Sequence, residues 1–363
     1  MNFKRKILIT GGAGYIGSHV VQQLGEAGYD LFIYDNCSTG LATSVLYGKL
    51  IIGDLGDIDH LYQVFSQYQF DAVLHFAGSL IVSESITNPL EYYANNTRNT
   101  LNLLQCCSAT NVNQIIFSST AAVYGEPEKN PVAETARTLP INPYGRSKLM
   151  SEWLIQDYEK ASGLRYVILR YFNVAGADPR GNLKLTNENA TQLIRVACDA
   201  ALGKRKNLSI FGTNFPTSDG TAIRDYIHVE DLASAHVAAL HYLEQGGESQ
   251  ILNCGYGYGY SVRQVIERVK AISNIDFPVL EVERRLGDPA SVVACVDRIS
   301  QVLNWKPIYA DLDVIVQTTL AGQKQLLKYE NMQNSSVNRF NLQQSNLNSS
   351  TVLSAVQGNK LCN

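Results

Sequence analysis

The sequence has no excess of either charge and no long apolar segment. Thirty basic residues face 33 acidic ones and leave a net charge of -3, so the composition gives no indication of a nucleic-acid or membrane-surface partner. No segment supplies the ~20 consecutive apolar residues that a membrane-spanning helix requires. The apolar run at residues 7–9 is too short for a signal peptide and leads directly into a glycine loop.

Cysteine is sparse and without pattern. The seven cysteines are odd in number and show no C-x-x-C spacing, which favours neither a disulfide framework nor a zinc site. We therefore expect no metal, and free thiols in a reducing cytoplasm. The cysteines are Cys37, Cys106, Cys107, Cys198, Cys254, Cys295 and Cys362.

What is present is an alternation of short β-branched runs with helical stretches. In 363 residues, 45% of them hydrophobic, this alternation predicts an α/β fold of the Rossmann type, a doubly wound parallel sheet covered on both faces. The principal helices are expected at 17–27, 89–109 and 143–162. The expected strands of the first half are 6–10, 30–35, 49–54, 71–77, 114–119 and 165–171.

The composition divides the chain into three parts. Residues 1–175 are predicted to form the domain with the parallel sheet. Residues 176–328, less regular and richer in Gly, Asn and Arg, are predicted to form a smaller mixed α/β substrate domain, with some elements returning to the first. Residues 329–363 are rich in Asn, Ser and Gln, and this tail is predicted to be disordered because it has too little apolar surface to bury.

A glycine loop follows the first predicted strand. The spacing Gly11-x-x-Gly14-x-x-Gly17 leads into an apolar helix, and such a turn lets backbone N–H groups approach a pyrophosphate at the helix N-terminus. Asp35 at the end of the second strand favours NAD, because its carboxylate can bind ribose hydroxyls and would repel a 2′-phosphate. Asp54, after the third strand, could meet the adenine amino group. A plain tight turn and ordinary surface acids are the alternatives.

Tyr144 and Lys148 are four residues apart, just behind Pro143, which suits the first position of a helix. Both side chains would lie on one face near the edge of the sheet. An ammonium beside a phenol favours the phenolate, so Tyr144 is a candidate general base for a sugar hydroxyl. Thr120, at the end of a strand, could hydrogen-bond the same oxygen. An ordinary helix turn and a strand cap are the alternative interpretations.

Together with these features, a series of further motifs makes residues 5–325 resemble the UDP-glucose 4-epimerase family of the extended short-chain dehydrogenase/reductases. The order of the motifs is specific for nucleotide-sugar epimerases and less specific for the sugar. The motifs are TGGAGYIGSH (10–19), HFAG (75–78), PLEYYANN (89–96), FSSTAAVYGEP (117–127), PYGRSKLMSE (143–152), RYFNVAGADP (170–179), DGTAIRDYIHVEDLA (219–233) and RRLGDPA (284–290).

The resemblance implies two sets of binding residues besides the catalytic Tyr144, Lys148 and Thr120. The implied NAD-binding residues are Gly11, Gly14, Tyr15, Ile16, Gly17, Asp35, Asn36, Asp54, Leu55, Phe76, Ala77, Gly78, Asn95, Tyr144, Lys148 and Tyr171. The implied residues for a UDP-sugar are Thr120, Tyr144, Asn173, Asn189, Ser209, Phe211, Arg224, Arg285, Asp288 and Val292.

The implied reaction interconverts UDP-glucose and UDP-galactose. Tyr144 takes the proton of the 4-hydroxyl while hydride leaves carbon 4 for NAD⁺, and the resulting 4-keto sugar turns and is reduced on its other face. The family also implies a homodimer formed through the helices at 92–109 and 144–162.

Some positions differ from the family pattern. Leu80 lies where some family members have a lysine that helps to hold NAD. Residues 188–192 differ from the usual stretch under the sugar, and Cys295 occupies a position where aspartate is common. Val292 leaves the sugar range open to N-acetylhexosamines or pentoses. A 4,6-dehydratase is the nearest rival, but Ala121 and its neighbour stand where that family has Asp-Glu. A non-catalytic NAD-sensing protein is the other alternative.

Overall fold

The computed structural model describes residues 4–183, 191–285 and 287–328. The predicted disordered tail 329–363 and the predicted ligand Asn189 lie outside these residues. Within them, no helix combines the length and apolar character needed to cross a membrane.

A seven-stranded sheet forms the larger part of the molecule, with the order β11-β6-β5-β4-β1-β2-β3 and every pairing parallel. This confirms the predicted doubly wound α/β fold. The chain reverses direction across the sheet between β1 and β4, and ligands of such folds bind at this switch point. The strands are β1 (Lys6–Thr10), β2 (Asp30–Asp35), β3 (Lys49–Ile52), β4 (Ala72–His75), β5 (Gln114–Thr120), β6 (Arg165–Tyr171) and β11 (Gln250–Cys254).

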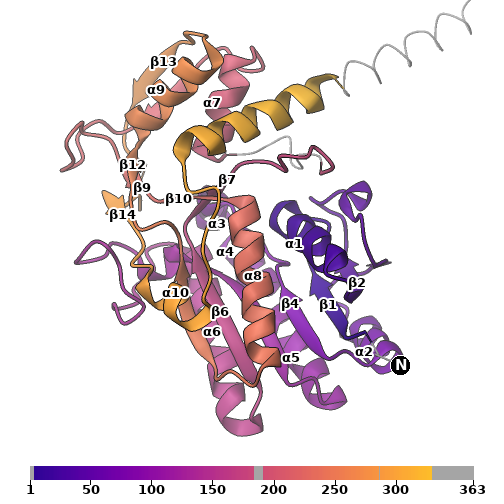
Figure 1. Cartoon of the computed structure of the whole chain (residues 1–363). Helices are drawn as coiled ribbons and strands as arrows, with labels where there is room; N and C mark the ends of the chain where they lie inside the picture. Colours follow the sequence, from indigo (N-terminus) through magenta and orange to yellow (C-terminus); the bar gives the residue numbers. More distant parts are fainter. Residues whose placement is uncertain (1–3, 184–190, 286, 329–363) are drawn as a thin grey trace, which may run out of the picture.

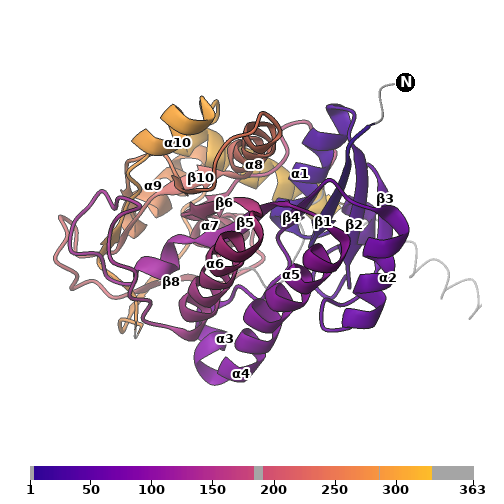
Figure 2. The ribbon, with the colours of Figure 1, turned by 90° about the horizontal axis from the view of Figure 1, so that it is seen from below.

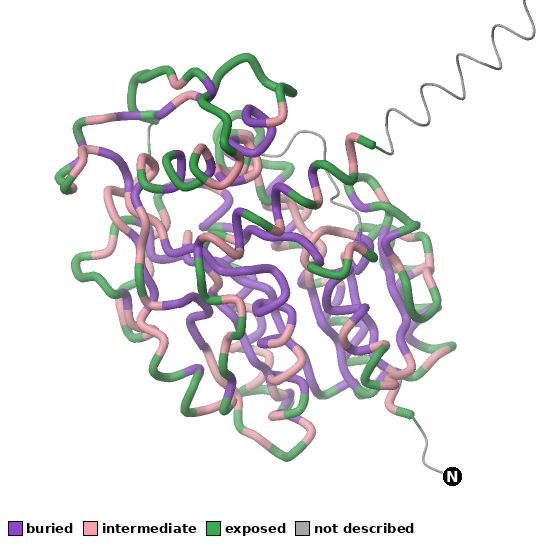
Figure 3. The backbone as a smooth tube through the Cα atoms, turned by 45° about the horizontal axis from the view of Figure 1, so that its top comes forward, coloured by how far each residue is buried: buried purple, intermediate pink, exposed green. Residues whose placement is uncertain are grey.

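Helices cover both faces of this sheet because most of its strands are apolar on both sides (Figures 1 and 2). Ile7 and Ile9 pack in one core with α1 (Tyr15–Glu26) and α8 (Val229–Glu244). Leu8, which points to the other face, packs in a second core. The helices on that face are α2 (Ile58–Tyr68), α5 (Asn99–Thr110) and α6 (Pro143–Ser162). The buried residues of Figure 3 accordingly follow the strands.

Smaller sheets lie beyond the carboxyl ends of the large one (Figure 1). β10 (Tyr226–His228) pairs with β7 (Asn173–Ala175), and β13 (Val279–Val282) pairs with β8 (Leu208–Phe211). A third sheet has the order β12-β9-β14. Its strands are β12 (Tyr260–Ser261), β9 (Ile223–Arg224) and β14 (Ser291–Val292). Helices α7 (Leu193–Ala201) and α9 (Val262–Ser273) pack with the small sheets, whereas α10 (Asp297–Leu303) contacts α8 and β11 of the large sheet.

Two differences from the sequence-based expectation lie in the first half of the chain, near the glycine loop and α6. Helix α2 was not predicted; Asp57 caps it by accepting a hydrogen bond from the backbone of His60 at 3.0 Å. The helix expected at 89–109 is divided into α4 (Pro89–Tyr92), a π-helical segment and α5. Buried Asn96 in that segment donates to the Ser79 carbonyl at 3.0 Å and to the Ser147 hydroxyl at 2.9 Å. π-turns of this kind occur frequently at functional sites.

Candidate active site

The glycine turn between β1 and α1 is formed by backbone segments in close contact. Gly11 has φ +73°, and a Cβ there would lie 2.5 Å from the Ala77 nitrogen; a Cβ at Gly17 would lie 2.3 Å from the Gly11 carbonyl oxygen. Gly14 is the N-cap of α1, where no described side chain caps the helix. Its backbone N–H groups are therefore positioned for an anion, as the sequence predicts. Tyr15 and Ile16 form the first turn.

Replacing Gly11 by alanine is expected to destabilise the protein by roughly 2–4 kcal/mol and to weaken nucleotide retention, because the new methyl group meets backbone at a positive φ. Denaturant unfolding and the NAD content of the purified protein measure both effects. Gly28→Ala is the control: Gly28 also has a positive φ, +87°, but its Cβ would meet nothing within 4 Å. Equal losses in the two variants would contradict the role of close packing at Gly11.

The ends of the neighbouring strands place the predicted acidic residues beside this turn. The Asp35 carboxylate accepts hydrogen bonds from the backbone of Ala13 at 2.9 Å and of Cys37 at 2.8 Å. Asn36 donates to Asp54 at 2.8 Å. The other predicted residues of this region lie after β3 and β4 and in the π-helical segment; they are Leu55, Phe76, Ala77, Gly78 and Asn95.

Asn99 is a candidate that the sequence reasoning missed. It is buried, and its Oδ1 atom has no hydrogen-bond partner within the described chain. Its Nδ2 atom donates to the side chain of Asn95, one helical turn earlier, at 3.0 Å. The unpartnered Oδ1 atom of Asn99 is suited to a bound group. Together with the uncapped N-terminus of α1 and the nearby Asp35 carboxylate, it fits a bound dinucleotide. The Asn-x-x-x-Asn spacing is the signal that could have identified Asn99.

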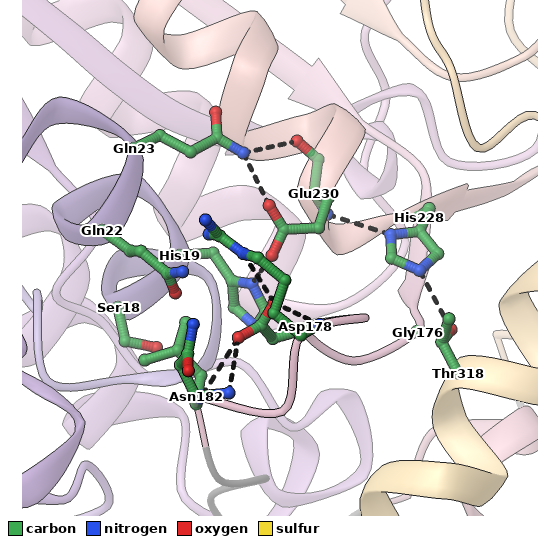
Figure 4. Close-up of polar contacts among 12 residues, drawn as sticks. Ser18, His19, Gln22, Gln23, Gly176, Asp178, Asn182, His228, Glu230 and Thr318 are labelled. Atoms are coloured by element: carbon green, nitrogen blue, oxygen red, sulfur yellow. Dashed lines mark hydrogen bonds and ion pairs between the residues drawn. The ribbon is translucent and has the colours of Figure 1, made fainter. Parts of the chain in front are cut away.

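Polar contacts attach the glycine-loop helix to the second half of the chain (Figure 4). His19 on α1 bonds Glu230 on α8 at 2.5 Å, and Gln23 donates to the same carboxylate at 2.7 Å. The Tyr15 hydroxyl donates to the Gly176 carbonyl at 2.6 Å. These contacts fix α1 against segments more than 150 residues away.

Helix α6 places Tyr144 and Lys148 at the carboxyl edge of the sheet. Asn142 caps the helix by accepting from Gly145 N at 2.8 Å, and Pro143 occupies its first turn. The position of Pro143 is what the sequence predicts, and the Asn142 cap is an addition from the structure. Tyr144 is 8% exposed and Lys148 is 5% exposed, so both work in a nearly dry environment. The Lys148 ammonium lies 4.2 Å from the centre of the Phe117 ring.

The electrostatics of this pair differ from the expectation of a lowered tyrosine pKa. Burial raises the pKa of the Tyr144 phenol, and a hydrogen bond with Thr120 only partly opposes this rise. Burial also lowers the pKa of Lys148 to about 7, against the attraction of the Glu152 carboxylate. Desolvation outweighs the expected effect of Lys148 because both groups lie away from water.

The ends of β5 and β6 bring two more predicted residues to the same edge. Thr120 is the last residue of β5, and its hydroxyl accepts from Ala122 N at 3.1 Å. Tyr171 is the last residue of β6 and receives a hydrogen bond from Ser118 at 3.0 Å. Thr120 and Tyr171 are register partners in the parallel ladder, so strand pairing sets their spacing.

Most of the predicted nucleotide-sugar residues that the structure describes lie on the small sheets or, like Arg285 and Asp288, in the segment between β13 and β14. The Arg224 guanidinium contacts the Asp288 carboxylate at 2.6 Å, and the Arg285 guanidinium lies 3.5 Å from the centre of the Phe211 ring. Val292 is buried and is the register partner of Arg224. Asn173 and Ser209 belong to β7 and β8. The structure thus pairs Arg224 with Asp288, although the sequence assigns the two to different parts of the ligand.

The parallel sheet, the glycine turn at its switch point and the buried Tyr–Lys pair define a dinucleotide-dependent enzyme. The model of the family described as "NAD dependent epimerase/dehydratase family" matches residues 7–255. The chain therefore belongs to that family, which confirms the predicted NAD cofactor.

The relatives are named UDP-glucose 4-epimerases, as the resemblance in the sequence predicts. One from Azospirillum brasilense is 50% identical over 322 residues, which span 88% of this chain and 92% of that protein. A solved structure of UDP-glucose 4-epimerase from Brucella ovis in complex with NAD is 42% identical, with a TM-score of 0.85; the match covers 87% of this chain and 98% of that one. The UDP-Glc/GlcNAc 4-epimerase of Campylobacter jejuni is 47% identical, with a TM-score of 0.78 over 88% and 99% of the two chains.

Proposed function

We propose that this protein is an NAD-dependent isomerase that interconverts UDP-glucose and UDP-galactose by inverting carbon 4 of the sugar. The observation that carries the proposal is the placement of Thr120, Tyr144 and Lys148 together, buried, at the carboxyl edge of the sheet beside the glycine turn. The names of the relatives give the substrate class.

Tyr144 is the proposed general base and acid. Its hydroxyl takes the proton of the sugar 4-hydroxyl and returns a proton when the 4-keto sugar is reduced on its opposite face. When bound, NAD⁺ supplies reversible hydride acceptance. Thr120 hydrogen-bonds Tyr144 and offers a second partner for the substrate oxygen. The positive charge of the Lys148 ammonium favours the Tyr144 phenolate and so opposes part of the rise in pKa that burial causes.

The proposed binding mode separates the nucleotide from the sugar. Arg224 and Arg285 would hold the diphosphate by charge-assisted hydrogen bonds, Asp288 the uridine ribose, and Ser209 and Phe211 the uracil. The sugar must turn, so it requires few fixed contacts. In this proposal the cations lie on or beside the small sheets, and the proton-transferring groups lie at the carboxyl edge of the large sheet.

A 4,6-dehydratase is the alternative that the family's name also allows. Such an enzyme needs an acid and a base to remove water across carbons 5 and 6. In this chain Ala121 and Ala122 follow Thr120, and neither side chain can transfer a proton. The reading as an epimerase is therefore favoured.

The range of sugars is the finer part of the proposal. The Campylobacter relative is named for both glucose and N-acetylglucosamine substrates. Val292 is buried in an apolar cluster, and its own side chain is smaller than an aromatic one that would exclude an N-acetyl group. The purified protein should be assayed with UDP-galactose, UDP-N-acetylgalactosamine and UDP-arabinose. Absence of turnover with UDP-galactose would contradict the proposal.

A homodimer through α5 and α6 is the proposed assembly. These helices run beside each other on one face of the molecule (Figure 2), and large apolar side chains are exposed on and next to them. These are Leu90, Leu101, Met150 and Trp153. A second copy packed as a four-helix bundle would cover them.

The described cysteines are all free thiols, which supports the proposed cytoplasmic location.

Trp153→Glu is expected to convert the dimer into a monomer at micromolar concentration, because Trp153 is 54% exposed in the single chain and a charge there would be buried by the partner copy. Sedimentation velocity measures the change. Trp153→Phe, which keeps an apolar ring, is the control and should stay dimeric. A wild-type protein that sediments as a monomer would contradict the assembly.

A further inference from the structure

A buried ion pair lies directly behind the proposed catalytic groups. Glu152 on α6 is 0% exposed and binds Arg170 on β6, which is 4% exposed. The Nη2 atom of Arg170 lies 2.6 Å from one carboxylate oxygen, and its Nε atom lies 3.0 Å from the other. The Ser119 hydroxyl donates to the same carboxylate at 2.5 Å. Three elements of the fold therefore meet at one buried carboxylate.

Each member of this cluster is a close neighbour of a proposed site residue. Ser119 immediately precedes Thr120 on β5, and Arg170 immediately precedes Tyr171 on β6. Glu152 follows Lys148 by one helical turn on α6. Because neighbouring residues on a strand point to opposite faces, the cluster lies behind the site while its chain neighbours form the site.

The cluster continues toward the small sheets. Arg170 donates to the Tyr124 hydroxyl at 3.1 Å, and Tyr124 donates to Asn253 on β11 at 2.7 Å. Asn253 in turn donates to the Val132 carbonyl at 2.8 Å. The Val132 nitrogen donates to the Val293 carbonyl at 2.7 Å, next to the strand that carries Val292. A continuous set of hydrogen bonds thus joins the catalytic helix to the proposed sugar side.

A buried ion pair is a poor source of stability, because the loss of water costs about as much as the attraction returns. Apolar side chains of similar size would hold these elements together at least as well. The three hydrogen bonds do something that apolar packing does not: they fix the spacing and orientation of β5, β6 and α6. That specificity is useful where proton transfer requires a set distance.

We propose that Ser119, Glu152 and Arg170 are positioning residues that set the relative placement of Thr120, Tyr144, Lys148 and Tyr171, and that the Glu152 carboxylate holds Lys148 as an ammonium. This inference rests on the proposed function. Four other charged or titratable groups lie around this part of the site: the Tyr144 phenol on the same helix, the Arg170 guanidinium and the Tyr171 phenol on β6, and the His75 imidazole on β4. Burial lowers the pKa of His75 to about 3, and its ring lies between the Thr10 and Thr100 hydroxyls. His75 is therefore neutral, so Glu152 is the group that supplies a counter-charge to Lys148.

Ser119→Ala tests the positioning role without disturbing the ion pair. The variant should lose on the order of tenfold in kcat for UDP-galactose, with KM and NAD content unchanged, because β5 loses its bond to α6. Ser234→Ala is the matched control. Ser234 lies on α8, away from the site, and its hydroxyl accepts a hydrogen bond from the Trp305 indole at 2.8 Å. If both variants melt at similar temperatures and only Ser119→Ala loses kcat, the proposal stands; equal kcat in the two variants overturns it.

Glu152→Gln tests the electrostatic part with a readout that needs no turnover. In NAD-loaded protein labelled with ¹³C at the lysine Cε, the Lys148 resonance, assigned by its absence in Lys148→Arg, should titrate at lower pH in the variant than in wild type. An unchanged titration, or a shift to higher pH, overturns this part. If Glu152→Gln does not fold, Ser119→Ala still decides the positioning role. Wild-type protein inactive on UDP-sugars would refute the proposed function separately, while the titration would still report on Glu152.

Discussion

Tyr144→Phe is expected to reduce the rate of epimerisation about 10²–10⁴-fold while NAD stays bound. The substitution removes only the hydroxyl that is proposed to exchange a proton with the sugar, and the ring keeps its packing in the buried site. KM should change little, because the proposed nucleotide contacts lie on other elements. Steady-state kinetics and the nucleotide content of the purified variant measure both quantities.

A neighbouring phenol provides the control for this prediction. Tyr92 lies edge-on to Tyr144 with ring centres 6.4 Å apart, and its hydroxyl bonds Glu84 at 2.9 Å, away from the proposed reaction. Tyr92→Phe should therefore retain most of the activity. Near-normal turnover by Tyr144→Phe, or an equal loss in both variants, would show that Tyr144 is not the base.

Lys148→Met is expected to have two opposite effects. Activity should fall by at least about 10²-fold, because the ammonium no longer favours the Tyr144 phenolate. The nucleotide-free protein should nevertheless become more stable by roughly 3–5 kcal/mol at pH 7, because an ordinary lysine pKa of 10.5 is lowered to about 7 by burial. A methionine fills the same space without a charge to desolvate.

The gain in stability should depend on pH in a defined direction. Between about pH 7 and 10.5 the unfolded chain binds a proton at Lys148 that the folded chain does not, so the stability of the wild type rises with pH in this window. The advantage of Lys148→Met should therefore be largest near pH 7 and should shrink toward pH 10. Denaturant unfolding at both ends of the window measures it.

Lys160→Met on the same helix is the control, since Lys160 has a side chain 73% exposed. It should change stability little at either pH. A Lys148→Met variant that is less stable than the wild type at pH 7 would contradict the assigned burial effect.

Much of the fold could be predicted from local patterns. The strands of the large sheet are apolar and short, and the glycine spacing and Pro143 mark where two helices begin. Chain order alone could not place β11, because residues 250–254 return beside β6 from a part of the sequence that lies between strands of the small sheets. The π-helical segment was also unpredictable, since it depends on Asn96 reaching Ser147 across 51 residues.

The candidate site was predictable in its residues but not in its electrostatics. The i,i+4 spacing of Tyr144 and Lys148 suggests a mutual effect on pKa, whereas the structure shows that burial dominates both groups. The carboxylate that counters Lys148 was already present in the quoted motif as Glu152. Its role requires knowing that Arg170 and Ser119 reach it from two strands.

The contact between Arg224 and Asp288 has a consequence for how a nucleotide enters and leaves. In the proposed role, an incoming diphosphate does not meet a bare cation but replaces a carboxylate already 2.6 Å away. The net free energy of binding is the difference between the contact of Arg224 with the diphosphate and its contact with Asp288. This difference is smaller than the free energy of either contact alone. On departure of the product, Asp288 can re-form the pair, so the exchange moderates affinity and favours release.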